Sequence, residues 1–320
     1  MFDLLRNRAS LGLRFLLPVV STVALVSIWA CNKKAQPSTA QASPKTFASP
    51  DDAGKGLFEA AKSGDQETLL AIFGPGSKEL IYTGDTAEDK ASLDGFVRAY
   101  QVMNRWRKLG DGTEMLLIGA DNQAFPIPLK SAAGHWYFDA AAGKEELLAR
   151  RIGRDEIVAI DVCGALADAQ EQYFAQKHGG VKQYAQKFVS DPGQENGLYW
   201  PDTPGQPKSP VGPVAAQATA DGYKADPAHR QPFHGYYFAM LTKQGPDAPG
   251  GAKDYIVNGK MTGGFAVVAY PAKYGDSGAM TFIVDRDGVV LQKDLGRSTD
   301  QVASAMTEFN PDKTWTVVAQ

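Results

Sequence analysis

The chain has 320 residues, with 33 Lys+Arg against 36 Asp+Glu and a formal net charge of -3. Hydrophobic residues make up 43% and charged residues 22% of it, which is typical of a chain that buries a core and excludes both global disorder and a polytopic membrane protein. The even charge balance argues against nucleic-acid binding, which needs clustered Lys and Arg. With only two cysteines, Cys31 and Cys163, the chain cannot form a disulfide framework or a zinc ribbon.

Residues 1–31 have the pattern of an export signal. Arginines precede a short apolar run that ends at Ala30-Cys31, and a run this short is not typical of a permanent transmembrane helix. Ser27-Ile28-Trp29-Ala30-Cys31 resembles a bacterial lipobox, with Trp29 in the place of the usual small residue. We therefore expect an exported, periplasmic protein with a lipid anchor at Cys31, and Asn32 favours the outer membrane by resemblance to enterobacterial sorting rules. The alternatives are a plain signal peptide and an uncleaved anchor.

The composition divides the remaining chain into four parts. Residues 32–50 are rich in Ala, Ser, Pro, Gln and Lys without apolar periodicity, which predicts a flexible linker. Residues 51–189 predict an α+β lobe, residues 190–234 a Pro/Gly-rich bridge, and residues 235–320 a β-rich lobe. The fold class expected for the whole chain is therefore α+β.

In the N-terminal lobe, apolar periodicity predicts helices over 51–63, 65–73 and 87–108 and a long helix over 143–176, kinked at Gly153. Strands are expected over 114–118, 124–129 and 135–138, with the prolines at 126 and 128 making the middle strand an edge or bent one. The buried face of the long helix is expected to carry Ile157, Ile160, Cys163, Ala167 and Tyr173. Free Cys163 is interpreted as an inert core residue.

The bridge is expected to contain a short helix near 211–222. The C-terminal lobe is expected to form an antiparallel sheet with one helix over 298–309. Its strands are predicted at 236–241, 265–270, 280–284, 289–293 and 315–318.

Two short motifs suggest chemistry that their surroundings do not support. Gly275-Asp276-Ser277-Gly278 matches the nucleophile motif of chymotrypsin-like proteases, but the glycine and proline that usually follow are absent, as is an upstream histidine in the right context. Asp285-Arg286-Asp287-Gly288 is similar to the start of a calcium loop, but apolar residues occupy the later ligand positions. We interpret both as turns. The four histidines show no metal-ligand spacing, so we expect no catalytic set, metal or cofactor.

A dense charged stretch lies within the long helix, between Glu145 and Glu156. At a spacing of four residues, Glu146–Arg150 and Arg151–Asp155 are expected to pair on the helix surface. The alternative is a cationic patch of Arg150, Arg151 and Arg154 that binds an anionic partner.

Seven unusual strings together resemble a bacterial family catalogued as domain of unknown function 2950, over about residues 51–320. The resemblance implies an exported protein and supplies no activity. The strings are Phe125-Pro126-Ile127-Pro128-Leu129, Gly134-x-Trp136-x-Phe138-Asp139, Arg150-Arg151-Ile152-Gly153-Arg154-x-Glu156, Gly197-Leu198-Tyr199-Trp200, Ser209-Pro210-x-Gly212-Pro213, His234-Gly235-Tyr236-Tyr237-Phe238 and Met261-Thr262-Gly263-Gly264-Phe265.

Residues 235–290 are also similar to the globular tail of some type IV pilin-like proteins, through Ala269-Tyr270-Pro271, Tyr274-Gly275-x-x-Gly278 and Phe282-x-Val284-Asp285-x-x-Gly288-Val289. The chain lacks the Gly-Phe start of a prepilin and the glutamate five residues later. We therefore expect a shared sheet module rather than assembly into a pilus.

The resulting hypothesis is a non-enzymatic binding or scaffolding module of the cell envelope, with an envelope protein as its partner. The contact residues predicted for it are Tyr199, Trp200, His234, Tyr236 and Tyr237, because aromatic side chains dominate binding surfaces. The alternative for the aromatic residues is that they join the two lobes. Two other functions stay open. An envelope hydrolase would need a cleft with two carboxylates about 5–10 Å apart, and a pilin-like or secretion component would need an exposed strand edge in the last lobe.

Overall fold

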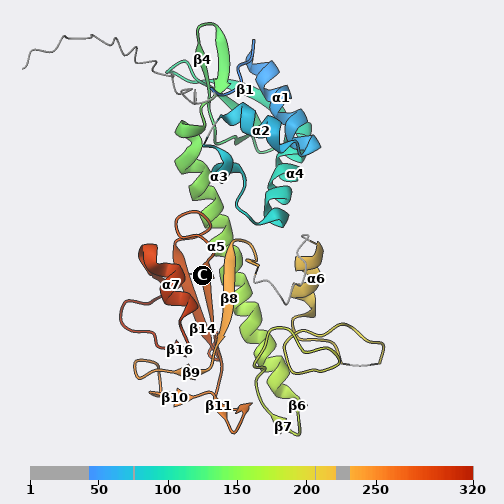
Figure 1. Cartoon of the computed structure of the whole chain (residues 1–320), viewed down its shortest axis with the longest axis vertical. Helices are drawn as coiled ribbons and strands as arrows, with labels where there is room; N and C mark the ends of the chain where they lie inside the picture. Colours follow the sequence, from blue (N-terminus) through green and yellow to red (C-terminus); the bar gives the residue numbers. More distant parts are fainter. Residues whose placement is uncertain (1–42, 75, 206, 221–230, 320) are drawn as a thin grey trace, which may run out of the picture. The chain divides into compact units, whose positions relative to one another are not determined.

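The computed structural model describes residues 43–74, 76–205, 207–220 and 231–319, and they form the predicted α+β fold. Helices α1 to α4 and a small antiparallel sheet precede the long helix α5, and a second antiparallel sheet follows it (Figure 1). The first sheet has the strand order β1-β2-β4-β5, with β3 paired to β2. The second has the order β17-β15-β14-β13-β8. The predicted export signal and most of the predicted linker lie outside the described residues.

Capping residues place the N-terminal helices. The side chains of Ser49, Asp65 and Asp85 accept hydrogen bonds from backbone N–H groups in the first turns of α1, α2 and α4, which would otherwise lack partners. The helices are α1 (Pro50–Ser63), α2 (Gln66–Phe73), α3 (Lys78–Ile81) and α4 (Thr86–Val102). The helix predicted over 87–108 is wrong beyond Val102, because the chain there turns into strand β1, which pairs along its length with β2. Sheet pairing overrides the helical periodicity of this segment.

The first sheet is antiparallel throughout. Its strands are β1 (Asn104–Lys108), β2 (Glu114–Ile118), β3 (Gln123–Ala124), β4 (Leu129–Ala132) and β5 (His135–Phe138). The single strand predicted over 124–129 is therefore wrong. Because proline has no N–H to donate to a ladder, Pro126 and Pro128 lie between β3 and β4 rather than inside a strand.

The N-terminal core packs these helices against this sheet. Phe47, within the stretch predicted to be a linker, is buried in it and pairs with Trp136 through two backbone hydrogen bonds of 2.8 Å. Several aromatic rings of this core are in contact. The ring centroids of Phe73 and Phe138, for example, lie 5.5 Å apart. The buried residues of the N-terminal core are Phe47, Ala53, Leu57, Ala60, Ala61, Leu69, Ile72, Phe73, Ile127, Leu129 and Phe138.

Helix α5 (Ala140–Ala175) contributes to both halves of the described chain. Its 36 residues span about 54 Å at 1.5 Å per residue. It continues through Gly153 as a single helix, since one interior glycine costs only about 1 kcal/mol. Its buried stripe recurs every three to four residues, at positions 151, 155, 159, 163, 166, 170 and 173.

The buried stripe of α5 corrects one sequence prediction. Ile157 was expected on the buried face but is 62% exposed, because it lies two residues from both Asp155 and Ala159 and so on the opposite side of the helix. Cys163, Ala167 and Tyr173 are buried as predicted. Burial raises the pKa of the Cys163 thiol to about 12, as the inert core interpretation requires.

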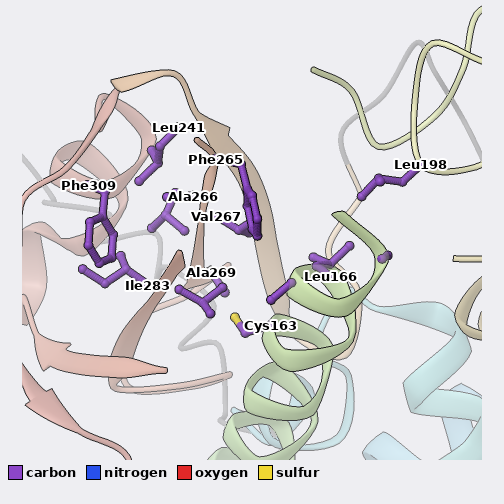
Figure 2. Close-up of a cluster of buried hydrophobic side chains, with 14 of the residues drawn as sticks. Cys163, Leu166, Leu198, Leu241, Phe265, Ala266, Val267, Ala269, Ile283 and Phe309 are labelled. Carbon is purple, nitrogen blue, oxygen red and sulfur yellow. The ribbon is translucent and has the colours of Figure 1, made fainter. Parts of the chain in front are cut away.

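The C-terminal core lies between α5 and the second sheet. Figure 2 shows Cys163 of α5 next to Ala269 of β13, with Leu241, Ile283 and Phe309 gathered on the sheet. The strands of this sheet are β8 (Tyr236–Leu241), β13 (Ala266–Pro271), β14 (Met280–Asp285), β15 (Leu291–Asp294) and β17 (Thr316–Val317). All pairs are antiparallel, and β13 and most of β14 are buried.

Shorter elements complete the chain. The helix predicted over 298–309 is wrong beyond Ser304: a 3-10 turn, η1 (Gly296–Ser298), leads into α7 (Thr299–Ser304), and β16 (Glu308–Phe309) then pairs in parallel with β9. The predicted bridge helix is confirmed as α6 (Gly212–Ala220). The other short strands are β6 (Lys177–His178), β7 (Val181–Lys182), β9 (Lys243–Gln244), β10 (Lys253–Asp254), β11 (Ile256–Val257) and β12 (Lys260–Met261). Across the described ranges, none of the helices combines the length and the apolar character that crossing a membrane requires.

Candidate functional site

A cavity of about 510 Å³ opens into the N-terminal core. This volume lies within the range of about 300–1,000 Å³ that is usual for small-molecule sites. Most of its lining is apolar and comes from α1, α2, α4 and the turn after β3; it includes Leu57, Leu69, Phe73, Phe96, Phe125 and Ile127. A second hollow, of about 550 Å³ beside Lys273 and Arg297, is lined by four residues of the turn after β13 and by one residue each of η1 and α7, and it has no comparable apolar wall.

Helix α4 has an inverted burial pattern. Of its residues, all of which the structure describes, Glu88 is the only buried one. Leu93, Phe96 and Val97, spaced as in the apolar face of a core helix, are only half-buried. An ordinary core helix buries its apolar residues and exposes its glutamates. Leu93 and Phe96 pack against the N-terminal core and also line the cavity, so part of each side chain stays exposed.

The charged groups of the cavity come mainly from α5. Arg150, Arg151 and Arg154 line it together with Glu88 and Asp89 of α4. Arg150 and Arg154 are one turn apart, so their side chains leave the same face of the helix. The cavity therefore has an apolar body and a charged region, a combination that suits an amphipathic molecule.

Each of these two arginines also binds the protein. The Arg154 Nη2 donates to Glu88 Oε1 at 2.5 Å. The Arg150 Nε donates to Glu146 at 2.7 Å, and its Nη1 donates to the Ala124 carbonyl at 2.7 Å. These bonds fix the guanidinium planes, while 36% of the Arg150 side chain and 51% of the Arg154 side chain stay exposed.

Asp155 lies beneath this arrangement and is 1% exposed. Neither of its oxygens, nor Glu88 Oε2, accepts a hydrogen bond from any described residue, although the Arg154 Nε lies 3.6 Å from Asp155 Oδ1. Burial, and then repulsion by the Glu88 carboxylate, raise the pKa of Asp155 far above its usual range. Asp155 therefore keeps its proton at neutral pH. Two neighbouring carboxyl groups can hydrogen-bond only through such a proton, so we assign it to a bond from Asp155 to Glu88.

The main chain approaches Asp155 closely at Gly235. A Cβ at this position would lie 2.8 Å from Asp155 Oδ2, and the glycine has φ +71°, a conformation that L side chains rarely adopt. Glycine is therefore required here.

Arg151 joins three segments of the chain. It is buried, and its guanidinium donates to the Asp276 carboxylate and to the carbonyls of Glu79 and Leu80, at the end of α3. The Lys273 Nζ lies 3.0 Å from Asp276 Oδ2, so two cations contact this one carboxylate. The Arg151–Asp155 pair predicted from helix spacing is thus wrong, because Arg151 binds Asp276, 125 residues away. The predicted Glu146–Arg150 pair is confirmed at 2.7 Å.

The Gly275-Asp276-Ser277-Gly278 motif is a turn, as its surroundings in the sequence indicated. Ser277 Oγ accepts a hydrogen bond from its neighbour Lys273 N at 3.1 Å, within the same turn. Asp276 belongs to the Arg151 contact. The close approach of Gly278 to the Tyr236 ring explains its glycine, since a Cβ there would lie 2.1 Å from Tyr236 Oη.

The aromatic residues predicted as contact sites are dispersed. Tyr236 is fully buried and donates to the Met280 carbonyl, and buried Trp200 donates to the Pro207 carbonyl, so these two side chains offer little surface. Tyr199 and Tyr237 are half-buried and pack against the C-terminal core. His234 is the one that lines the cavity. At Tyr199 and Tyr237, binding stays a prediction.

The sequence analysis missed Glu88 and Asp155 as candidate site residues. Glu88 follows the N-cap Asp85 by three residues, the spacing of a capping box, so its local pattern indicated a helix start. Its partner Arg154 lies 66 residues away, and no local signal connects the two. In the parts of the chain that the structure describes, no group of three or more His, Cys, Asp or Glu is arranged to hold a metal ion.

Fold and site together define an α+β protein with an apolar cavity and a layer of buried, paired charges along one helix. The chain belongs to the family described as "Protein of unknown function (DUF2950)", whose match covers residues 44–318. No curated protein and no solved structure shows significant similarity to it.

Proposed function

We propose that the protein is an exported, lipid-anchored protein of the cell envelope that binds a small amphipathic molecule in this cavity. The observation that carries the proposal is the inverted burial of α4: its buried residue is Glu88, while Leu93 and Phe96 face the cavity. Leaving apolar side chains half-exposed costs about 25 cal/mol for each Å² not removed from water. A bound apolar chain recovers that free energy. The proposed export and lipid anchoring rest on the signal pattern that ends at Cys31.

Binding is favoured over hydrolysis by the state of the acidic groups. The two carboxyl groups that come together next to the cavity, Glu88 and Asp155, are both almost completely buried. Glu88 accepts a hydrogen bond from Arg154, and burial together with the Glu88 charge raises the pKa of Asp155, so neither is placed to activate a water molecule on a substrate.

Two experiments test the two halves of the proposal. For binding, the full-length chain carrying Cys31→Ser, which lacks the acyl acceptor, is titrated with the neutral apolar fluorophore N-phenyl-1-naphthylamine. We expect saturable binding at one site. Ser92→Phe fills the mouth of the cavity from α4 and should weaken binding by at least about tenfold, equivalent to about 1.4 kcal/mol. Gln101→Phe adds the same ring to an exposed position of α4 outside the lining and should leave binding unchanged. Equal affinities in all three proteins, or no saturable binding, would refute the proposal.

To test export and lipid anchoring, cells expressing the full chain are fractionated, and lipidation is followed with an alkyne-labelled fatty acid. We expect label and membrane association in the parent chain and the loss of both in Cys31→Ser. Label that persists in Cys31→Ser would refute anchoring through this cysteine and leave the cavity hypothesis intact.

A further inference from the structure

We propose that the molecule held in the cavity is a single-chain amphiphile with an anionic head, a carboxylate or a phosphate monoester, and that Arg150 and Arg154 bind this head. This inference rests on the proposed function and names the ligand class for the same site.

The charges that line the cavity differ in how far they are exposed. Glu88 is buried and bound to Arg154, and Arg151 is buried and bound to Asp276. Asp89 is half-buried, its Oδ1 accepts two hydrogen bonds from Thr83, and burial raises its pKa. This leaves the guanidinium groups of Arg150 and Arg154, with side chains 36% and 51% exposed, as the cations of the lining that a ligand head can reach. A ligand head that enters the cavity therefore meets these two guanidinium groups.

Both guanidinium groups keep N–H donors that the protein does not use. A guanidinium group has five N–H donors in a planar fork that matches carboxylate and phosphate oxygens. Arg150 uses Nε and one donor of Nη1 for Glu146 and Ala124. Arg154 uses Nη2 for Glu88 and directs Nε toward Asp155. Both groups are thus held in place by protein contacts and still have donors to offer, which is how a preorganised anion site is built.

The acidic pair Glu88 and Asp155 lies next to these guanidinium groups. With the Asp155 proton shared with Glu88, the pair carries one negative charge rather than two. That charge is balanced by Arg154 alone, and Glu146 offsets Arg150. An anionic head therefore meets a locally neutral protein with exposed donors, instead of a carboxylate excess that would repel it.

The shape of the remaining lining indicates the rest of the ligand. Leu57, Leu69, Phe73, Phe96 and Phe125 form an apolar wall. Because each buried methylene contributes about 0.8 kcal/mol, an alkyl chain provides most of the affinity and the head decides selectivity.

The test measures competition with N-phenyl-1-naphthylamine on the full-length Cys31→Ser protein. The competitors are dodecanoate, dodecyl phosphate, dodecanol and dodecyltrimethylammonium, which share a chain and differ in their heads. We expect either anion to compete about tenfold to a hundredfold better than dodecanol, the range for hydrogen bonds to a charged group, and the cation to compete worst. The preference between dodecanoate and dodecyl phosphate then distinguishes a fatty acid from a phosphorylated lipid fragment.

Matched variants test which side chains bind the anionic head of the ligand. Arg150→Gln should reduce the advantage of the anions over dodecanol, both measured on the same variant, by about tenfold. Arg154→Lys, which keeps a positive charge beside Glu88, should reduce it less. Arg107→Gln removes an exposed arginine of β1 outside the cavity and should change nothing.

The outcomes separate the two proposals. Dodecanol or the cation competing as well as the anions, or an anion preference that survives Arg150→Gln unchanged, would overturn the inference about the head and leave the cavity as a binding site. Failure of the fluorophore to bind would overturn the proposed function itself.

Discussion

Replacement of Arg151 tests whether its buried charge contact holds the described chain together. Arg151→Met removes the guanidinium but keeps an apolar side chain of similar length. The substitution removes the closest cation of Asp276, whose side chain is only 13% exposed. It also removes the donor to the carbonyls of Glu79 and Leu80. Breaking a buried ion pair from one side costs about 3–5 kcal/mol. Because Lys273 remains 3.0 Å from Asp276, we expect about 3 kcal/mol. At about 2–4 °C per kcal/mol, the melting temperature should fall by about 6–12 °C.

Urea unfolding of the full-length Cys31→Ser protein, followed by circular dichroism, measures this loss. Lys90→Met is the control, since it breaks an ion pair whose side chains are 76% and 47% exposed, and it should cost no more than about 0.5 kcal/mol. In Arg151→Met/Asp276→Leu the charge left by the single change is also removed. The double variant should therefore lose less than the sum of the single variants, by about 1–3 kcal/mol. A loss below about 1 kcal/mol in Arg151→Met, or strict additivity, would refute the reasoning.

Two further predictions concern buried titrating groups. The raised pKa of Asp155 means that the folded chain holds a proton that the unfolded chain releases above about pH 4. The unfolding free energy of the parent should therefore fall as pH rises. In Asp155→Asn the amide can donate to Glu88 without titrating. The unfolding free energy of this variant minus that of the parent should therefore increase with pH, by at most about 1.4 kcal/mol per pH unit. Urea unfolding from pH 5 to pH 8 measures this difference, and a constant difference would contradict it. For Cys163, the raised thiol pKa and full burial predict no reaction with iodoacetamide at pH 8 in the folded protein and complete reaction in urea. Mass spectrometry measures the labelling. Rapid labelling of the native chain would show that the core interpretation is wrong.

The fold could be predicted from the sequence where local signals act alone. Strands β2, β5 and β8 begin and end where alternation and turn residues indicated, and the side chain of Asp65 caps α2 as its position suggested. The errors occur where a distant segment decides the outcome. Residues 104–108 continue a helical pattern, yet become β1 because β2 supplies a full ladder of partners. No property of residues 104–108 by themselves contains that information.

The site was missed for a related reason. Apolar periodicity assigns the buried face of a helix from its hydrophobic residues, but the buried stripe of α5 runs through Arg151, Asp155 and Gln170. Each of these is buried because a remote group satisfies it: Asp276 for Arg151, Glu88 for Asp155, and both backbone groups of Ala185 for Gln170. Ile157 was assigned to the wrong face by the same rule. The sequence analysis did consider Arg150, Arg151 and Arg154 as an anion-binding patch, and the structure divides them into one buried structural arginine and two at the cavity.

Because α5 supplies side chains to both cores, its length sets the rotational phase between them. An α-helix turns about 100° per residue. One residue inserted between Leu147, which packs on the N-terminal core, and Ala159, which is buried in the C-terminal core, would swing one contact face a quarter of a turn or more away from its partners. Even two added turns, which nearly restore the angle, would lengthen the helix by about 10 Å and separate Arg151 from Asp276 or from Leu80. Insertions in the surface loops are therefore expected to be tolerated, whereas this internal stretch of α5 behaves as a spacer of fixed length.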